Sequence, residues 1–129
     1  PIVNVTAIRI TPSKAELTAA LRLNISFELD RDAVAAYWEI KFLVDCAQQR
    51  IIKILGQTDV DDYSEGESDM TFSVDSIDVS GIAPSTLANS GLLMAVLMVD
   101  GEEVASVNMV VNVAKRDGEL VRDILSPLD

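Results

Sequence analysis

Polar and apolar residues alternate along most of this chain, which is the pattern of β-strands with one face in a core and one in water. The segment 21–29 (LRLNISFEL) is the clearest case, because every odd position is apolar and every even position is polar. In the segment 37–45 (YWEIKFLVD), Leu43 is an apolar residue on the polar side, opposite the apolar row of Trp38, Ile40, Phe42 and Val44. Further strands are predicted at 2–10, 50–55 and 70–77.

A hairpin is predicted at 90–113, because the pair Asp100-Gly101 readily takes the positive φ angles of a type I′ turn. Its first strand, 91–99, is apolar on both faces. With a two-residue turn Val99 pairs with Glu102, and an unshifted register follows from there. This register places on the outward face Leu93, Ala95, Leu97, Ser106, Asn108 and Val110, and on the inward face Leu92, Met94, Val107 and Met109.

The apolar outward face of this hairpin needs a cover, because an exposed sheet face is normally polar. Either a loop or helix of this chain lies over it, or a separate protein does, since contiguous apolar patches mark interfaces. Leu43 extends the same patch if its strand is a neighbour. Such a surface suits an amphipathic helix laid across it.

Helical patterns are scarce. Segment 13–20 begins with the spacing of a capping box but equally fits a turn in a loop. Segment 31–36 fits a single helical turn. At the C-terminus, segment 117–129 places apolar residues on one helical face before Pro127.

These patterns predict an all-β fold, an antiparallel immunoglobulin-like β-sandwich with short helical segments in its loops. The sandwich core spans 1–114. Residues 115–129 form a C-terminal tail of the same domain, in which a short helix is one option.

Composition narrows the function. The chain has 129 residues and a formal net charge of −11, so a basic partner protein is expected and direct contact with nucleic-acid phosphates is not. The lone Cys46 has no internal disulfide partner, which favours a reducing intracellular compartment. No apolar run approaches the length of a membrane span and the start of the chain lacks a secretory signal, so we expect a soluble protein that does not bind membranes.

The residue types of most catalytic and metal sites are missing. The sequence has no histidine, which removes the commonest general base, and with a single cysteine no structural zinc site can be built. No phosphate-binding glycine loop or nucleophile elbow occurs. We therefore expect no enzyme activity, no metal and no cofactor.

The segment 58–69 (TDVDDYSEGESD) is strongly acidic, with six carboxylates. Its spacing does not match a helix-loop-helix calcium site. It fits a solvated hairpin tip, a negatively charged surface that attracts a basic partner, or a metal site of another type.

The order of several segments resembles a known family. The opening "IVNVTAIRI", the strand "LNISFELD" followed by "WEIKFLV", the hairpin "SGLLMAVLMVDGEEVASVNMVVN" and the closing "LVRDILS" are similar, in that order, to the core of the anti-silencing-function histone chaperones. The resemblance covers most of the chain. It implies an elongated immunoglobulin-like sandwich and a nuclear protein that binds the dimer of core histones three and four, covering a histone helix with a sheet face during nucleosome assembly and disassembly.

The resemblance also implies a set of contact residues. Leu93 corresponds to the outward residue at the centre of the family's histone-binding face, and Leu43 to an outward residue of the tryptophan strand. The expected histone-binding residues are Leu43, Asp45, Gly91, Leu93, Ala95, Ser106, Asn108 and Val110.

The chain departs from the family at several of these positions. Ser106 and Val110 replace an arginine and a tyrosine, and "CAQQR" replaces most of the acidic residues after the tryptophan strand. The family's second site, which receives a basic peptide from histone deposition factors, is reduced here to Asp30 and Asp32. A second interpretation is therefore kept, an immunoglobulin-like structural or adhesion module that uses the same hairpin face for self-association.

Overall fold

The computed structural model describes residues 2–46 and 49–128, except for the side chains of residues 45, 46 and 49. Ten strands and one short helix occur in these ranges. They are β1 (Val3–Thr11), β2 (Lys14–Glu16), β3 (Leu21–Leu29), β4 (Ala33–Cys46), β5 (Gln49–Gln57), β6 (Asp61–Tyr63), β7 (Gly66–Val74), α1 (Pro84–Leu87), β8 (Ser90–Val99), β9 (Glu102–Arg116) and β10 (Glu119–Leu125).

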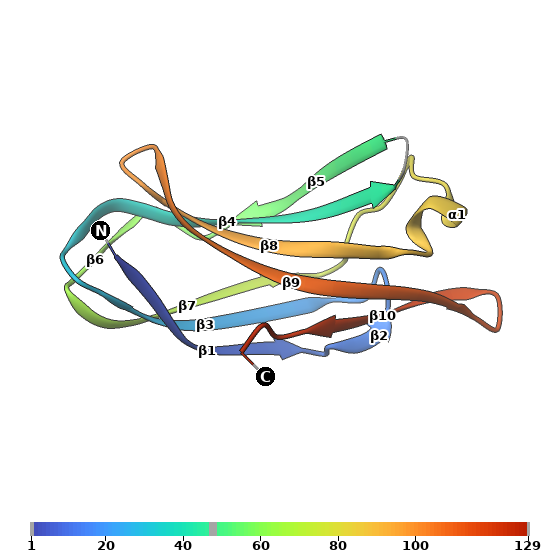
Figure 1. The fold of residues 1–129 in the computed structure, drawn as a ribbon, viewed down its shortest axis with the longest axis horizontal. Helices are drawn as coiled ribbons and strands as arrows, with labels where there is room; N and C mark the ends of the chain where they lie inside the picture. Colours follow the sequence, from blue (N-terminus) through green and yellow to red (C-terminus); the bar gives the residue numbers. More distant parts are fainter. Residues whose placement is uncertain (1, 47–48, 129) are drawn as a thin grey trace.

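The strands form two antiparallel sheets that pack face to face (Figure 1). The smaller sheet has the order β1-β3-β7, and the larger has the order β2-β10-β9-β8-β4-β5, with β6 paired to β4. The prediction of an all-β antiparallel sandwich is thus confirmed, while its immunoglobulin-like type stays a prediction. We call the side of the larger sheet that faces away from the smaller sheet the outer face.

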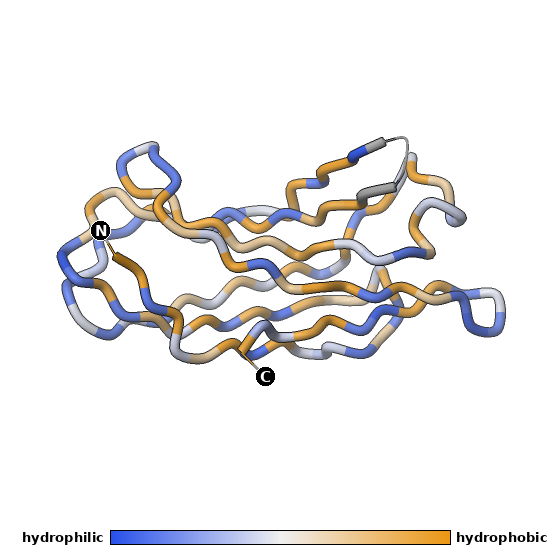
Figure 2. The backbone as a smooth tube through the Cα atoms, in the orientation of Figure 1, coloured by the Kyte–Doolittle hydropathy of each residue, from blue (hydrophilic) through white to orange (hydrophobic). Residues whose placement is uncertain are grey.

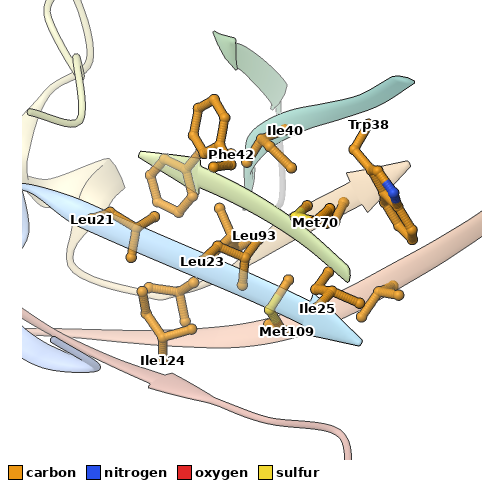
Figure 3. Packing of buried hydrophobic residues seen from close by; sticks show 14 of the residues in the cluster. Leu21, Leu23, Ile25, Trp38, Ile40, Phe42, Met70, Leu93, Met109 and Ile124 are labelled. Carbon is orange, nitrogen blue, oxygen red and sulfur yellow. The ribbon is translucent and has the colours of Figure 1, made fainter. Parts of the chain in front are cut away.

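The core lies between the sheets and follows the alternation of the sequence (Figures 2 and 3). The odd residues of β3 are buried against the even residues of β4, and Phe27 meets Trp38 edge to face with ring centroids 5.2 Å apart. Burying one such side chain stabilises the fold by about 1.5–3 kcal/mol. The exposed side of the smaller sheet is polar, as in the chain of contacts from Arg9 to Asn24 to Thr71.

Three segments with helical patterns form strands instead. Residues 14–16 form β2, the segment 31–36 leads into an irregular part of β4, and the C-terminal pattern forms β10, which pairs with β9 along its whole length. The option of a short helix in the C-terminal tail is therefore wrong. The physical reason is that pairing with a neighbouring strand satisfies the backbone of a segment this short better than two helical turns would.

The β8–β9 hairpin turns where the sequence predicts, but its register shifts. Asp100 and Gly101 both have positive φ angles, and Val99 pairs with Glu102. Between Leu97 and Met98 a β-bulge then inserts one extra residue on β9, so Leu93 lies opposite Met109 and not opposite Asn108. Since one residue of slip moves a strand's side chains to the other face, the outward assignment of β8 changes with it.

Candidate protein-binding face

Five apolar side chains line up across the outer face, one from each of five neighbouring strands. The strand registers pair Leu43 with Ile52 on one side and with Leu92 on the other, and continue from Leu92 to Val110 and from Val110 to Leu125. We call these five residues, Ile52, Leu43, Leu92, Val110 and Leu125, the central row.

Three residues of the central row are open to solvent, while Leu92 is half-buried and Leu43 is only 8% exposed. Ile52 is 53% exposed, Val110 42% and Leu125 44%, so the described part of the chain does not cover them. Between them the surface sinks into a depression of about 280 Å³ lined by Leu43, Leu92 and Val110, with Ser90 and Gly91 at its edge. Exposed Ile54 and half-buried Met94 extend the apolar surface along the strands. A contiguous apolar surface of this kind is typical of a surface that contacts another molecule.

Of the predicted contact residues, four lie on this face. Leu43 and Val110 belong to the central row, and Ser106 and Asn108 are exposed on β9 beside it. Asp45 lies in β4, and its side chain is outside the described residues. Whether these residues bind histones stays a prediction.

Leu93 and Ala95 are on the other side of the sheet, and their outward assignment is wrong. Both are at most 1% exposed and belong to the core cluster, together with Leu97 (Figure 3 shows Leu93 among the core residues). Gly91 shares their row, because a Cβ atom there would meet the Phe42 ring and the Leu43 carbonyl oxygen. The bulge on β9 is the cause, since an unshifted hairpin pairs Leu93 with outward Asn108.

The sequence prediction missed five residues of this apolar surface: Leu92, Met94, Ile52, Ile54 and Leu125. Leu92 was assigned inward because of the register, and Leu125 was assigned to a helix. The two isoleucines carry a usable signal, because Ile51 and Leu55 of the same edge strand alternate with them on the core side. Apolar residues on both faces of a strand indicate a second contact surface.

The rim of the central row is polar. On one side Glu39 and Lys41 form an ion pair of 3.1 Å. On the other side, a groove of about 570 Å³ over β9, β10 and β2 is lined in part by Asn112, Asp123 and Lys14. An apolar centre with a charged rim is the usual composition of a protein interface.

No family model matches the sequence, and no curated protein matches it. The outer face is therefore interpreted from its own geometry and charge, together with the resemblance of segment order.

The negative charge is gathered at one end of the molecule, which we call the acidic pole and define as residues 28–32, 59–69 and 100–103. These segments carry twelve acidic residues and one basic residue, whereas the rest of the sequence has nine of each. The Glu65 N–H donates to the Asp32 carboxylate and so joins the first two segments directly. Ala35, which follows the first segment, joins the other two, because its N–H donates to the Asp62 carboxylate and its carbonyl accepts the Asp100 N–H. Figure 2 shows hydrophilic loops at this left-hand end.

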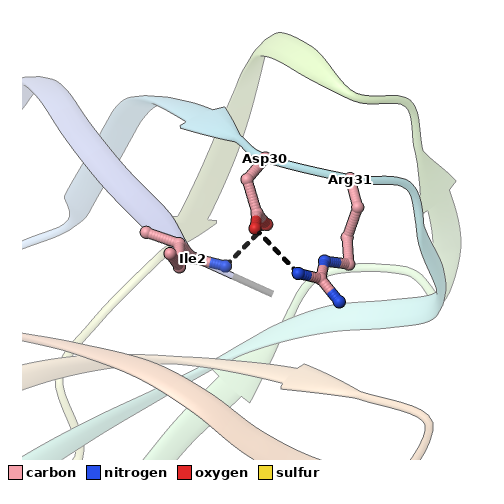
Figure 4. Close-up of polar contacts among 3 residues, drawn as sticks. All are labelled: Ile2, Asp30 and Arg31. Carbon is pink, nitrogen blue, oxygen red and sulfur yellow. Dashed lines mark hydrogen bonds and ion pairs between the residues drawn. The ribbon is translucent and has the colours of Figure 1, made fainter.

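The residues of the predicted second site lie in the acidic pole and already accept hydrogen bonds from this chain. The Asp32 carboxylate accepts the Glu65 N–H at 2.7 Å. The Asp30 carboxylate accepts the Ile2 N–H at 2.7 Å and pairs with Arg31 at 3.1 Å (Figure 4). Among the described residues, no group of three acidic or cysteine side chains is arranged to hold a metal ion. No described helix is long and apolar enough to cross a membrane.

The contacts of Asp30 predict an acid-dependent loss of stability. The Ile2 N–H and then Arg31 hold the pKa of Asp30 below its usual value of 3.8. A lowered pKa in the folded state contributes stability above the unfolded pKa and loses it as the pH falls through the folded pKa. Substituting Asp30→Asn should therefore flatten the fall of the urea midpoint below about pH 4. Equal slopes for the two proteins would contradict this.

Proposed function

We propose that this protein is a non-enzymatic histone chaperone that binds the dimer of core histones three and four through the outer face. The observation that carries the proposal is the central row, an outward apolar row across five strands with exposed residues at both ends and a depression at its middle. Ile54 and Met94 widen this apolar surface, and polar side chains border it. Such a protein would act in the nucleus, in nucleosome assembly and disassembly.

The length of the central row fits a helix of the partner. Neighbouring strands lie about 4.8 Å apart, so five strands span about 19 Å between the first and last residue. An α-helix rises 1.5 Å per residue, and about 13 residues cover this length. A partner helix that crosses the strands with apolar residues at every third or fourth position would place one in contact with each residue of the row.

The charge of the molecule favours a basic partner such as a histone. Because the acidic pole holds the whole excess of negative charge, it produces a field that attracts basic proteins and orients them as they approach. The residues of the central row lie outside the acidic pole. The charge that orients the partner and the apolar contact therefore come from different parts of the surface.

The resemblance of segment order supports the choice of histones, with one change of residue. Leu92, and not Leu93, occupies the centre of the outward row between Leu43 and Val110. The replacement of an arginine and a tyrosine by Ser106 and Val110 leaves fewer hydrogen-bond donors on β9 than in the resembled family. We therefore expect apolar contact to supply most of the affinity.

The proposal is tested by a Leu92→Arg substitution. Leu92 is half-buried and outward, so an arginine here extends into solvent while the protein is free and becomes trapped in an apolar contact when the partner binds. We expect calorimetric titration with the histone dimer at physiological salt to show binding at least about 30-fold weaker than for the parent, equivalent to about 2 kcal/mol.

Ser73→Arg is the matched control, because it adds the same charge on the exposed side of the smaller sheet, outside the acidic pole. This variant should bind like the parent. Equal loss in both variants would reduce the interaction to nonspecific charge. If the parent does not bind histones and sediments as a dimer that Leu92→Arg converts to a monomer, the self-association interpretation replaces the proposal.

A further inference from the structure

Two asparagines of β9 lie on either side of Val110 on the outer face. Asn108 and Asn112 are both exposed, and each is the next outward residue along the strand from Val110. They are four residues apart, which corresponds to about 13 Å. An α-helix with its side chains is about 10–12 Å across. A helix that lies over the central row therefore passes between the two asparagines where it crosses β9.

A serine hydroxyl holds the side chain of each asparagine. The Ser106 hydroxyl donates to Asn108 Oδ1 at 3.2 Å, and the Ser90 hydroxyl donates to Asn112 Oδ1 at 3.1 Å. Ser106 precedes Asn108 by two residues on the same strand, whereas Ser90 is the register partner of Asn112 on β8. Neither Nδ2 group donates to another described residue. The central row is thus bordered on β9 by two amide groups with free N–H donors.

These donors become a constraint when a partner covers them. In the free protein water accepts from both amides, because the two side chains are exposed. A helix docked on the central row displaces this water, and a covered N–H without an acceptor lowers the affinity. The five residues of the row are apolar and offer no side-chain acceptor. The acceptors must therefore come from the partner, one on each side of its helix.

The charges around Asn112 indicate the kind of acceptor. Asp123 of β10 lies opposite Asn112 and forms no ion pair with a described residue. A side-chain amide fits this pair, because its oxygen accepts from Asn112 and its nitrogen donates to Asp123. A carboxylate at the same place is repelled by Asp123 and by the net charge of −11 on the whole chain. Glutamine or asparagine is therefore favoured over glutamate or aspartate.

We infer that Asn108 and Asn112 are specificity-determining residues of the outer face, and that they select a helix with a glutamine or asparagine on each side of the apolar residue above Val110. Successive residues of a helix are about 100° apart, so the residues directly before and after an apolar contact point to its two sides. This inference rests on the proposed docking of a helix across the central row. It adds polar selection to an interface whose affinity is mainly apolar.

The test uses labelled helical peptides that carry five leucines along one face and are stapled so that they stay helical. In one peptide, glutamines stand directly before and after the second and the fourth leucine, so that either direction of the helix presents a pair of them to β9. In the other peptide, norleucine replaces these glutamines and keeps their length without polar atoms. In fluorescence anisotropy the glutamine peptide should bind about tenfold more tightly, as expected for two hydrogen bonds at a covered site.

Variants of the protein assign this preference to the asparagines. In the double variant Asn108→Leu, Asn112→Leu the norleucine peptide should bind at least as tightly as the glutamine peptide. Asn4→Leu is the matched control on the exposed side of the smaller sheet, and it should keep the tenfold preference. The double variant Ser90→Ala, Ser106→Ala should reduce the preference to about threefold, because the amides are then free to rotate.

Nuclear magnetic resonance gives a direct readout. The side-chain amide signals of Asn108 and Asn112 should shift with the glutamine peptide and much less with the norleucine peptide. Leu92→Arg should weaken both peptides alike, because it acts on the central row and not on the asparagines.

The outcomes separate this inference from the proposed function. It is overturned if neither peptide binds, if both bind equally, if the Asn108→Leu, Asn112→Leu variant keeps the preference, or if a second copy occupies the face in a dimer that the peptides do not dissociate. Histone binding that Leu92→Arg abolishes would leave the proposed function standing in each of these cases. If the glutamine preference is found but histones do not bind, the proposed function fails and the selection of the helix stands.

Discussion

Substituting Leu93→Arg is expected to unfold the protein, whereas Leu92→Arg leaves its stability nearly unchanged. Leu93 is 1% exposed and lies in the core between the two sheets (Figure 3). An arginine here has no acidic partner and no path to solvent, and a buried unpaired charge costs about 4 kcal/mol or more. Leu92 is on the opposite face of the same strand, so the arginine remains hydrated.

Urea unfolding followed by circular dichroism measures both free energies of unfolding. The comparison is direct because the two residues are adjacent, identical in type and given the same substitution. It also tests the β-bulge, because an unshifted hairpin exchanges the faces of the two residues. A folded Leu93→Arg protein together with an unfolded Leu92→Arg protein would show that the register is the unshifted one.

Substituting Arg122→Met is expected to lower the free energy of unfolding by about 3–5 kcal/mol. Arg122 is 2% exposed, yet its guanidinium has no acidic partner in the described structure. It donates instead to four backbone carbonyls of one segment, those of Pro12, Leu17, Ala19 and Ala20, at 2.7–3.2 Å. Methionine fills a similar volume but leaves all four buried or half-buried acceptors without this donor.

Arg122→Lys separates charge from geometry. Lysine keeps the positive charge, but its three N–H donors are all on one nitrogen atom. It therefore cannot reach four carbonyls that are arranged around a planar guanidinium. We expect an intermediate loss of stability, and for both variants faster hydrogen exchange of the amides in 12–20. If Arg122→Met has the stability of the wild type, the guanidinium contacts make no net contribution to the free energy of unfolding. Burial lowers the pKa of Arg122, which is consistent with a desolvated charge that is held by carbonyl dipoles.

Arg122 also shows how this fold positions its candidate site. The guanidinium fixes the segment that contains β2 against β10, and β10 supplies Leu125, the last residue of the central row. The flanking strand is therefore held in the sheet by a polar contact in the interior. We expect Arg122→Met to weaken partner binding only as far as it loosens β10.

Much of the fold was predictable from alternation alone. In β3 and β4 the polar and apolar rows are regular over nine residues or more, and the inward face of each strand is the predicted one. Leu43 points outward, also as predicted. The turn at Asp100-Gly101 was predictable for a local reason, because its residues tolerate positive φ angles. The elements that were not predictable in this way include β2, the irregular start of β4, β6, α1 and β10.

The orientation of β8 shows most clearly what alternation in the sequence cannot predict. Because this strand is apolar on both sides, its own sequence contains no signal for which side faces the core. The answer depends on one extra residue in the partner strand, which places Leu93 opposite Met109. The outward face of the hairpin was thus predicted correctly for β9, but on the wrong row of β8.

The sequence by itself determined the all-β class, the position of the hairpin turn, the inward rows of β3 and β4, and the excess of negative charge, because each follows from local alternation, local backbone preference or composition. Only the tertiary structure decided which row of β8 is outward, that 119–125 is a strand, that Arg122 is held by four carbonyls, and that the acidic segments meet at one end. These features depend on strand pairing between residues distant in sequence, where one residue of register changes the face of every side chain.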